Sequence, residues 1–292
     1  MTDEKQPGVN RRRVLATTGS IVGGLSISSG HVGSQSNKKT AREVFKQRIQ
    51  SSLQYKNATQ SLKKWRDYLE KQDITVHSNK FSVGPSSSES SSSGKFAGTQ
   101  HISDQEALDI TISLAVDGCG NYYTDLTWTY NKQQNGWHED TGKPPLDGTG
   151  LYYNENWWNV LYDSVSETTE TSKYVAYKDG SYGGNGPGFT VNDNNIWLYD
   201  DENKYHWAGV YLESVGDYSE DQRQVYGEYI HNWWEERTRV DSINVSYPAG
   251  ISISYTKEEY VDEWKTDTED DGDTFLKIKQ SEATQNTYQC RY

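Results

Sequence analysis

The sequence predicts a mainly β protein, namely an antiparallel β-sandwich domain preceded by a short amphipathic helical segment and a Ser-rich linker. Three observations lead to this fold class. From about residue 98 onward, hydrophobic and polar residues alternate in short runs that are separated by turn-forming residues. Between residues 40 and 72, hydrophobic residues instead recur at helical intervals of three and four. A serine-rich stretch of low complexity lies between the two patterns.

The N-terminal residues carry an export motif. Arg11 and Arg12 are followed, after one free position, by Val14 and Leu15, and a mildly hydrophobic run continues from there. This pattern resembles the twin-arginine signal of exported proteins. The resemblance implies that residues 1–30 are a signal peptide, that the twin-arginine translocase is a partner during export, and that the protein acts outside the cell or at its surface. The hydrophobic run is shorter than the roughly 20 apolar residues of a spanning helix, so we expect no stable transmembrane anchor.

The charge is distributed unevenly along the chain. Residues 1–80 contain 15 Lys and Arg against 6 Asp and Glu, which gives +9, whereas residues 81–292 contain 14 against 36, which gives −22. An acidic body behind a twin-arginine leader resembles the exported proteins of halophilic archaea, because surface charge keeps a protein soluble in concentrated salt. An acidic surface for cations or for a basic partner is the alternative interpretation. Because the acidic body repels phosphate, we expect no nucleic acid as a partner.

Residues 38–80 are predicted to be a basic helical segment, with one or two amphipathic helices over residues 40–72. Thr40 and Glu43 have the spacing of a capping box. The hydrophobic stripe comprises Phe45, Ile49, Leu53, Ala58, Leu62, Trp65 and Leu69. The polar face carries Arg42, Lys46, Arg48, Lys56, Lys63, Lys64 and Arg66. Such a segment either binds a membrane or a partner, or packs its stripe on the rest of the protein, or is a removable pro-segment. We favour the last two, because concentrated salt weakens electrostatic docking.

Two segments complete the predicted organisation. Residues 81–98 are the Ser-rich linker, and residues 99–292 are the acidic, aromatic-rich β-sandwich domain. Cys119 and Cys290 are the two cysteines of this domain. In an exported protein an even pair of cysteines indicates a disulfide, and neither cysteine has a neighbouring His or Cys at the spacing of a metal site. We therefore expect these two residues to be bonded to each other.

The strands of the domain are predicted from alternation and turn residues. Two hairpins are expected, one pairing residues 110–116 with 122–130 and one pairing residues 242–247 with 251–256. Residues 221–234 have hydrophobic side chains four apart and are compatible with a helix. Shorter strands are expected at residues 174–177, 189–191, 196–199, 207–212, 274–279 and 287–290.

One acidic loop has the pattern of a calcium site. Asp267, Glu269, Asp271 and Asp273 place carboxylates at alternate positions, which resembles the start of a calcium-binding loop. An EF-hand is excluded, because its twelfth position is Ile278 rather than a glutamate. A looser calcium site in a loop between strands and an acidic surface turn both remain open. We expect no other cofactor.

Paired tryptophans predict a binding surface. Trp157 and Trp158 are adjacent, as are Trp233 and Trp234, so each pair should direct at least one indole away from the sheet core. Such side chains can form a platform for sugar rings. The alternative is that aromatic residues build the core, since the chain contains 10 Trp and 22 Tyr but one Met. The aromatic residues nearby in the sequence are Trp137, Tyr152 and Tyr153.

The sequence favours binding over catalysis. It contains no Gly-x-Ser-x-Gly, His-Glu-x-x-His or Cys-x-x-Cys motif and no phosphate loop. We therefore predict an exported, non-catalytic binding or interaction protein whose partner is a surface glycan or another cell-envelope polymer. The second hypothesis is a secreted antimicrobial precursor with a removable N-terminal segment, whose layout resembles that of halocin precursors. The third is a secreted glycoside hydrolase that uses carboxylates beside tryptophans, such as Glu155, Glu235 and Glu236.

Overall fold

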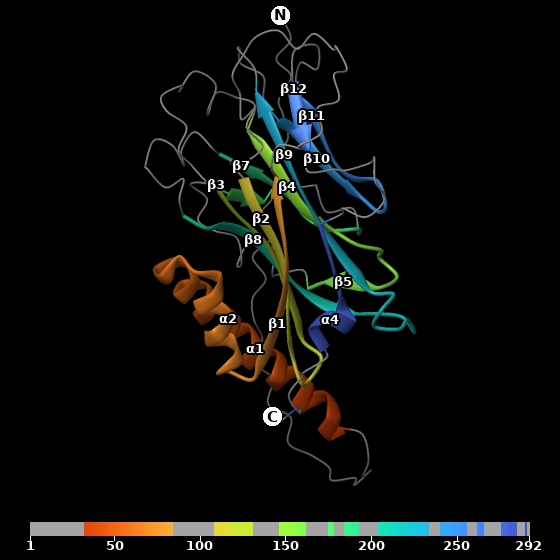
Figure 1. Ribbon diagram of the computed structural model, residues 1–292. Coiled ribbons are helices and arrows are strands. Elements are labelled where there is room, and N and C mark those ends of the chain that lie inside the picture. The colour runs from red at the N-terminus through yellow and green to blue at the C-terminus, as the bar shows by residue number, and fades with distance from the viewer. Residues whose placement is uncertain are drawn as a thin grey trace, which may run out of the picture.

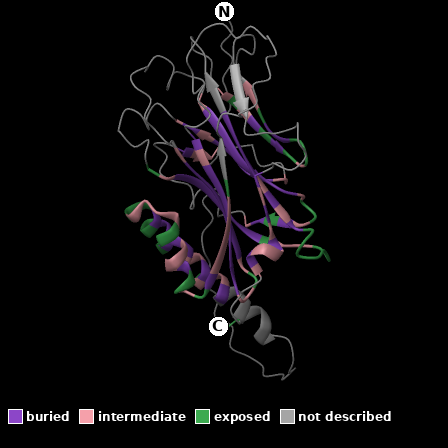
Figure 2. Cartoon of the chain, viewed as in Figure 1, coloured by how far each residue is buried: buried purple, intermediate pink, exposed green. Residues whose placement is uncertain are grey.

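The computed structural model describes residues 32–83, 108–130, 146–161, 175–177, 184–192, 204–233, 240–255, 262–265, 276–284 and 290. Within them, two antiparallel sheets pack face to face around the main hydrophobic core, which confirms the predicted mainly β sandwich (Figure 1). Helices cover the outer face of one sheet, and a two-stranded hairpin covers the outer face of the other. Both sheets are therefore largely buried (Figure 2).

The first sheet has five strands. Its spatial order is β1, β2, β3, β8 and β5, with every neighbouring pair antiparallel. Strands β2 and β3 are joined by a tight turn and form the first predicted hairpin, which is confirmed. The strand bounds are β1 Ile74–Val83, β2 Leu108–Asp117, β3 Tyr122–Tyr130, β8 His206–Ser214 and β5 Trp158–Val160.

The second sheet has six strands. Strands β12, β9, β4, β7 and β6 follow one another across it, and β13 pairs with β9 beside β12. The expected short strands at 174–177, 189–191 and 274–279 correspond to β6, β7 and β13, whereas 196–199 lies outside the described residues. The strand bounds are β12 Asp262–Lys265, β9 Gln224–Trp233, β4 Asp147–Tyr152, β7 Gly188–Val191, β6 Val175–Tyr177 and β13 Lys277–Lys279.

Local chemistry explains the turn between β2 and β3. The Asp117 carboxylate oxygen Oδ1 accepts hydrogen bonds from the backbone N–H groups of Cys119 and Asn121, both at 2.9 Å. Gly120 adopts a φ of +75°, which favours glycine. At this turn Cys119 is bonded to Cys290, with the two Cα atoms 4.7 Å apart. The predicted disulfide is therefore confirmed, and it closes a loop with a sequence separation of 171.

The helical segment packs on the five-stranded sheet. Helix α1 spans Val32–Thr59 and helix α2 spans Leu62–Glu70. The Ser61 side chain caps α2 by accepting a hydrogen bond from the Lys64 backbone N–H at 3.3 Å. Most of the predicted stripe forms a second core with residues of β1, β2, β3 and β8, so packing on the rest of the protein is confirmed. That core comprises Phe45, Ile49, Leu53, Trp65, Leu69, Ile74, Ala115, Tyr123, Trp207 and Tyr211. Ala58, assigned to the stripe, is exposed instead.

Three further local predictions in this part of the chain were wrong. Thr40 does not cap a helix, because α1 begins at Val32. Residues 74–80, assigned to the helical segment, belong to β1, which pairs with β2 along its full ten residues. Lys56 does not lie on the polar face, because its side chain is completely buried. The segment predicted to be helical therefore also contributes a strand, β1, to the five-stranded sheet of the sandwich.

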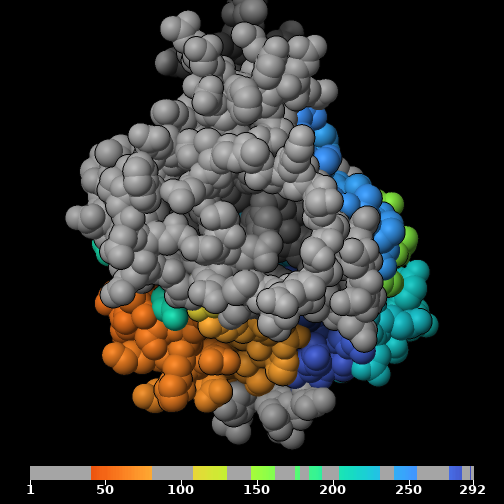
Figure 3. All heavy atoms as spheres, turned by 45° about the horizontal axis from the view of Figure 1, so that its top comes forward, coloured from red at the N-terminus to blue at the C-terminus, as the bar shows by residue number. Residues whose placement is uncertain are grey.

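A hairpin forms a further layer on the six-stranded sheet. Strands β10 (Val240–Ser246) and β11 (Gly250–Tyr255) confirm the second predicted hairpin. Gly148 of β4 permits the close approach, because a Cβ atom there would lie 2.4 Å from Ile253 Cδ1. Figure 3 shows this hairpin in light blue at the upper right, away from the helices in orange at the lower left.

Residues 221–234 were compatible with a helix, but Gln224–Trp233 form strand β9. Val225 and Tyr229 face the main core, whereas Tyr226 and Ile230 face the β10–β11 hairpin. Because both faces of β9 are covered, the hydrophobic residues of this segment do not alternate strictly with polar ones. Their spacing of four therefore fits a helix as well as it fits a strand buried on both sides.

Candidate functional site

Four aromatic side chains gather where the β10–β11 hairpin meets the six-stranded sheet. The rings of Tyr152 and Tyr226 stack with centroids 5.1 Å apart and an interplanar angle of 14°. The Tyr247 ring lies 5.7 Å from the Tyr226 ring and 5.3 Å from the Trp157 ring. We call Tyr152, Trp157, Tyr226 and Tyr247 the aromatic cluster. Each ring contacts the next, so the cluster is a continuous strip rather than a set of isolated side chains.

Four chain segments build this cluster. Tyr152 of β4 and Tyr226 of β9 are directly paired in the ladder, which explains their stacking. Tyr247 follows β10 in the turn of the hairpin. Trp157 lies in a turn after β4, where its backbone N–H donates to the Asn154 carbonyl at 2.9 Å. The backbone thus brings together residues that are up to 95 positions apart, from 152 to 247.

A buried carboxylate fixes the hairpin beside the cluster. Glu228 of β9 is 5% exposed, and its Oε2 atom accepts a hydrogen bond from the Ile251 backbone N–H at 2.7 Å. Gly250 lies against the same carboxylate with a φ of +80°, and a Cβ there would be 2.4 Å from Oε2. These contacts hold the turn that carries Tyr247 in one position on the sheet.

The aromatic cluster is partly accessible. Tyr152 is buried, whereas Trp157, Tyr226 and Tyr247 are half-buried. The Tyr226 hydroxyl donates to Gln224 Oε1 at 2.6 Å. Burial, followed by the nearby Tyr247 hydroxyl, raises the pKa of Tyr226 to about 12. Tyr226 therefore stays a neutral phenol at physiological pH, and the site offers ring surfaces, hydroxyls and amides without a fixed charge on the rings.

Raising the pH above 10 is expected to destabilise the protein partly through Tyr226. The unfolded chain loses this proton near the usual pKa of 10.0, whereas the folded protein keeps it up to about 12. The stability that Tyr226 contributes is complete below pH 10 and is lost as the pH rises through this window. In urea unfolding at several pH values, the free energy of unfolding should decline less steeply with rising pH for Tyr226→Phe than for the parent. Identical slopes would contradict the shifted titration.

The indoles of Trp157 and Trp158 point in different directions, as expected. They therefore do not form a platform together. Trp158 is 0% exposed and packs edge-on against Tyr122 in the main core, with ring centroids 5.0 Å apart. It therefore cannot stack on a ligand. Trp157 is half-buried and belongs to the aromatic cluster. Trp233 ends β9 with an undescribed side chain, and Trp234 lies outside the described residues.

Sequence reasoning missed Tyr226 and Tyr247. Tyr226 lies in a segment interpreted as a possible helix, so its outward direction was hidden. Tyr247 is the last residue of the predicted strand 242–247, directly before Pro248 of the predicted turn, and this position gives no indication of its neighbours. The contact between them depends on the hairpin folding over the sheet, for which the sequence contains no local signal.

Other predicted sites lie outside the described residues. These include the export signal Arg11, Arg12, Val14 and Leu15, the acidic residues Asp267, Glu269, Asp271 and Asp273, and the carboxylates Glu235 and Glu236. Glu155 is described and exposed. Among the described residues, no group of three or more His, Cys, Asp or Glu side chains is arranged to hold a metal ion. Within the same residues, no helix combines the length and the hydropathy that crossing a membrane requires.

These features define a disulfide-linked β-sandwich with a half-buried aromatic cluster on one outer face. No protein-family model matches the chain, and no curated protein is similar to it. Among solved structures, the T6 backbone pilin of serotype M6 Streptococcus pyogenes aligns with a TM-score of 0.26 and 9% sequence identity. The alignment covers 66% of this chain and 35% of the pilin chain. A likeness this slight supports no conclusion about fold or function.

Proposed function

We propose that the protein is exported through the twin-arginine pathway and acts outside the cell, or at its surface, as a non-catalytic binding protein. Its proposed ligand is a glycan or another cell-envelope polymer, and the aromatic cluster is the proposed binding site. The observation that carries the proposal is the continuous strip of aromatic rings, three of them half-buried, on an outer face of the sandwich.

The chemistry of the aromatic cluster suits sugar rings. A sugar presents apolar C–H faces and a rim of hydroxyls, so a site for it needs ring surfaces beside polar groups. Trp157 and Tyr247 provide the ring surfaces, and the Tyr226 hydroxyl and the Gln224 amide lie next to them. Asn154 and the exposed Asn156 add amides at the turn that carries Trp157.

Three observations support an extracellular location. The Cys119–Cys290 disulfide is of the kind that persists in oxidising compartments. The twin-arginine motif at residues 11–15 and the acidic composition of residues 81–292 are those expected of an exported halophilic protein. The calcium loop proposed at residues 267–273 would add a structural ion to the same surface protein.

Trp157→Ala and Tyr247→Ala are each expected to weaken glycan binding by about tenfold, which corresponds to roughly 1.4 kcal/mol per ring lost. The measurement is affinity for a panel of immobilised polysaccharides in concentrated salt. Tyr55→Ala is the matched control, because Tyr55 is 37% exposed on helix α1, away from the cluster. Binding of no glycan by the parent, or equal losses in all three variants, would reject the proposed site.

The alternatives make different demands on the structure. An antimicrobial precursor requires the N-terminal segment to leave, yet β1 pairs with β2 over ten residues and the helices bury a core of their own. A glycoside hydrolase requires a pair of carboxylates roughly 5–9 Å apart beside the bound sugar. Protein recovered from culture medium with an intact mass that lacks the N-terminal segment would favour the antimicrobial precursor. Release of sugar from a polysaccharide would favour the glycoside hydrolase.

A further inference from the structure

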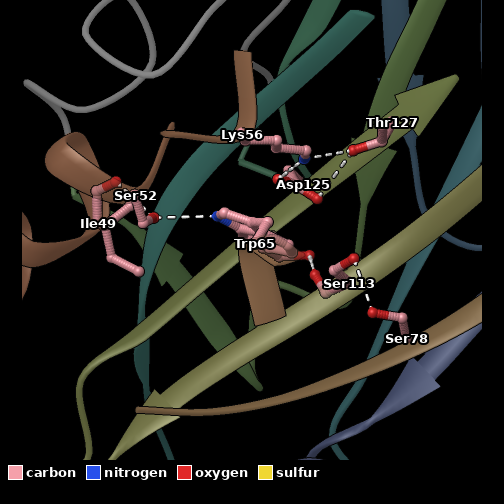
Figure 4. Close-up of polar contacts among 9 residues, drawn as sticks. Ile49, Ser52, Lys56, Trp65, Ser78, Ser113, Asp125 and Thr127 are labelled. Carbon is pink, nitrogen blue, oxygen red and sulfur yellow. Dashed lines mark hydrogen bonds and ion pairs between the residues drawn. The ribbon is translucent and has the colours of Figure 1, made fainter. Parts of the chain in front are cut away.

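A lysine and an aspartate lie in contact inside the protein, between helix α1 and the five-stranded sheet. Lys56 Nζ is 2.8 Å from Asp125 Oδ2, and both side chains are 0% exposed (Figure 4). The amine also lies 4.3 Å from the centre of the Trp65 ring and 5.4 Å from that of Trp207. The ion pair is thus enclosed by aromatic side chains instead of water.

A hydroxyl bridges the two reactive groups. Thr127 lies two residues after Asp125 on the same face of β3. Its Oγ1 atom accepts a hydrogen bond from Lys56 Nζ at 2.6 Å and donates one to Asp125 Oδ1 at 3.3 Å. Figure 4 shows the three side chains directed toward one another. Together the amine, the hydroxyl and the carboxyl form a closed ring of hydrogen bonds.

We propose that Lys56 and Asp125 condense to an amide that covalently joins helix α1 to strand β3. Both groups are enclosed away from water, so solvent does not compete with the amine for the carboxyl group. Holding the two groups in contact gives an effective molarity on the order of 10⁵ M or more, whereas free amines and acids do not condense in dilute water. The water that forms leaves for bulk solvent.

Every atom of the reaction is supplied by the side chains present. A proton first passes from Lys56 Nζ to Asp125 Oδ2 along their hydrogen bond. The nitrogen lone pair then attacks the carboxyl carbon Cγ, and a second Nζ proton passes through the Thr127 hydroxyl to Oδ1. The Cγ–Oδ2 bond then breaks. Oδ2 takes one further proton from Oδ1 and leaves as water, and Oδ1 becomes the carbonyl oxygen of the amide. The products are one amide and one water, and no oxidant, metal or cofactor takes part.

A phenol beside the pair suits the intermediate. Tyr123 is completely buried on the same face of β3, two residues before Asp125, and its hydroxyl interacts with the Asp125 carboxylate. Burial, and then the charge of Asp125, raises the pKa of Tyr123 well above its usual value, so the phenol keeps its proton. A donor held in this state can stabilise the negative charge that develops on the carboxyl oxygen during attack.

Mass spectrometry of the full-length chain tests the proposal. After reduction and denaturation, the protein is expected to weigh one water less than its sequence predicts. Trypsin should then fail to cleave after Lys56, and the digest should contain one branched peptide that includes both Lys56 and Asp125. A full sequence mass, with a free tryptic peptide ending at Lys56, would show an ion pair only and overturn the proposal.

Two variants make the result specific. Lys56→Arg keeps a cation beside Asp125 but removes the nucleophilic amine, so its mass should show no loss of water. Thr127→Val keeps both reacting groups and removes the relay, so water loss should slow by on the order of 10²-fold after synthesis. Loss of water in Lys56→Arg, or a cross-link that maps to other residues, would also overturn the proposal. Should Lys56→Arg fail to fold, the peptide map of the parent decides alone.

Discussion

Lys56→Met is expected to lower the free energy of unfolding by about 3–5 kcal/mol. The substitution shortens the side chain by one atom and leaves the Asp125 carboxylate inside the protein with neither the Lys56 cation nor the proposed amide. Both groups are 0% exposed in the parent. A buried charge without a partner is among the most destabilising changes a single substitution can cause. Urea unfolding at constant salt measures the loss.

The matched control is Arg42→Ala. Arg42 joins the same helix to the same sheet through Glu213 at 2.8 Å, but the two side chains are 36% and 47% exposed. Solvent screens such a pair, so its loss should cost less than about 1 kcal/mol. Similar losses for Lys56→Met and Arg42→Ala would contradict the importance of the buried pair.

The double variant Lys56→Met with Asp125→Leu separates charge from packing. It removes both charged groups, so much of the stability lost in Lys56→Met should return. Neither variant can form the proposed amide, so the recovery measures the cost of the unpaired carboxylate alone. No recovery would mean that packing around Lys56, and not its charge, accounts for the loss.

Trp158→Ala is expected to destabilise the protein by about 3–5 kcal/mol. The indole is completely buried between the two sheets and packs against Tyr122, so its removal leaves a large cavity in the main core. Trp157→Ala, one residue earlier, removes the same indole from a half-buried position and should cost clearly less. Urea unfolding of the two variants measures the difference, and equal losses would contradict the assignment of Trp158 to the core and Trp157 to the surface.

The sequence predicts those elements whose hydrophobic residues lie mainly on one face. The β2–β3 and β10–β11 hairpins and the stripe of helix α1 each place hydrophobic residues at one clear period, and all three were predicted correctly. Strand β9 carries hydrophobic residues on both faces, so its period was ambiguous. Strand β1 lies at the edge of its sheet, and several of its residues between His77 and Lys80 are polar, so its sequence gives a weak strand signal.

The candidate sites depend on contacts that the sequence does not encode locally. Lys56 and Asp125 are 69 positions apart, and Lys56 falls within a run of basic residues that are otherwise solvent-accessible. Lys56 lies three residues after Leu53 and seven after Ile49, so it is on the buried face of α1. Only its partner Asp125 has no local signal in the sequence. Trp157 could be identified as an outward indole from its neighbour Trp158, but its contact with Tyr247 required the hairpin to be in place.

The disulfide has a topological consequence for proteolysis. The Cys119–Cys290 bond converts residues 119–290 into a covalent ring that contains most strands of both sheets. A single cut inside this ring would leave the molecule in one piece on a non-reducing gel. A cut between residues 83 and 108 lies outside the ring and would free α1, α2 and β1 on the same gel. Because Asp125 belongs to the ring and Lys56 does not, an amide between them would keep even that cut from releasing a fragment under denaturing, non-reducing conditions.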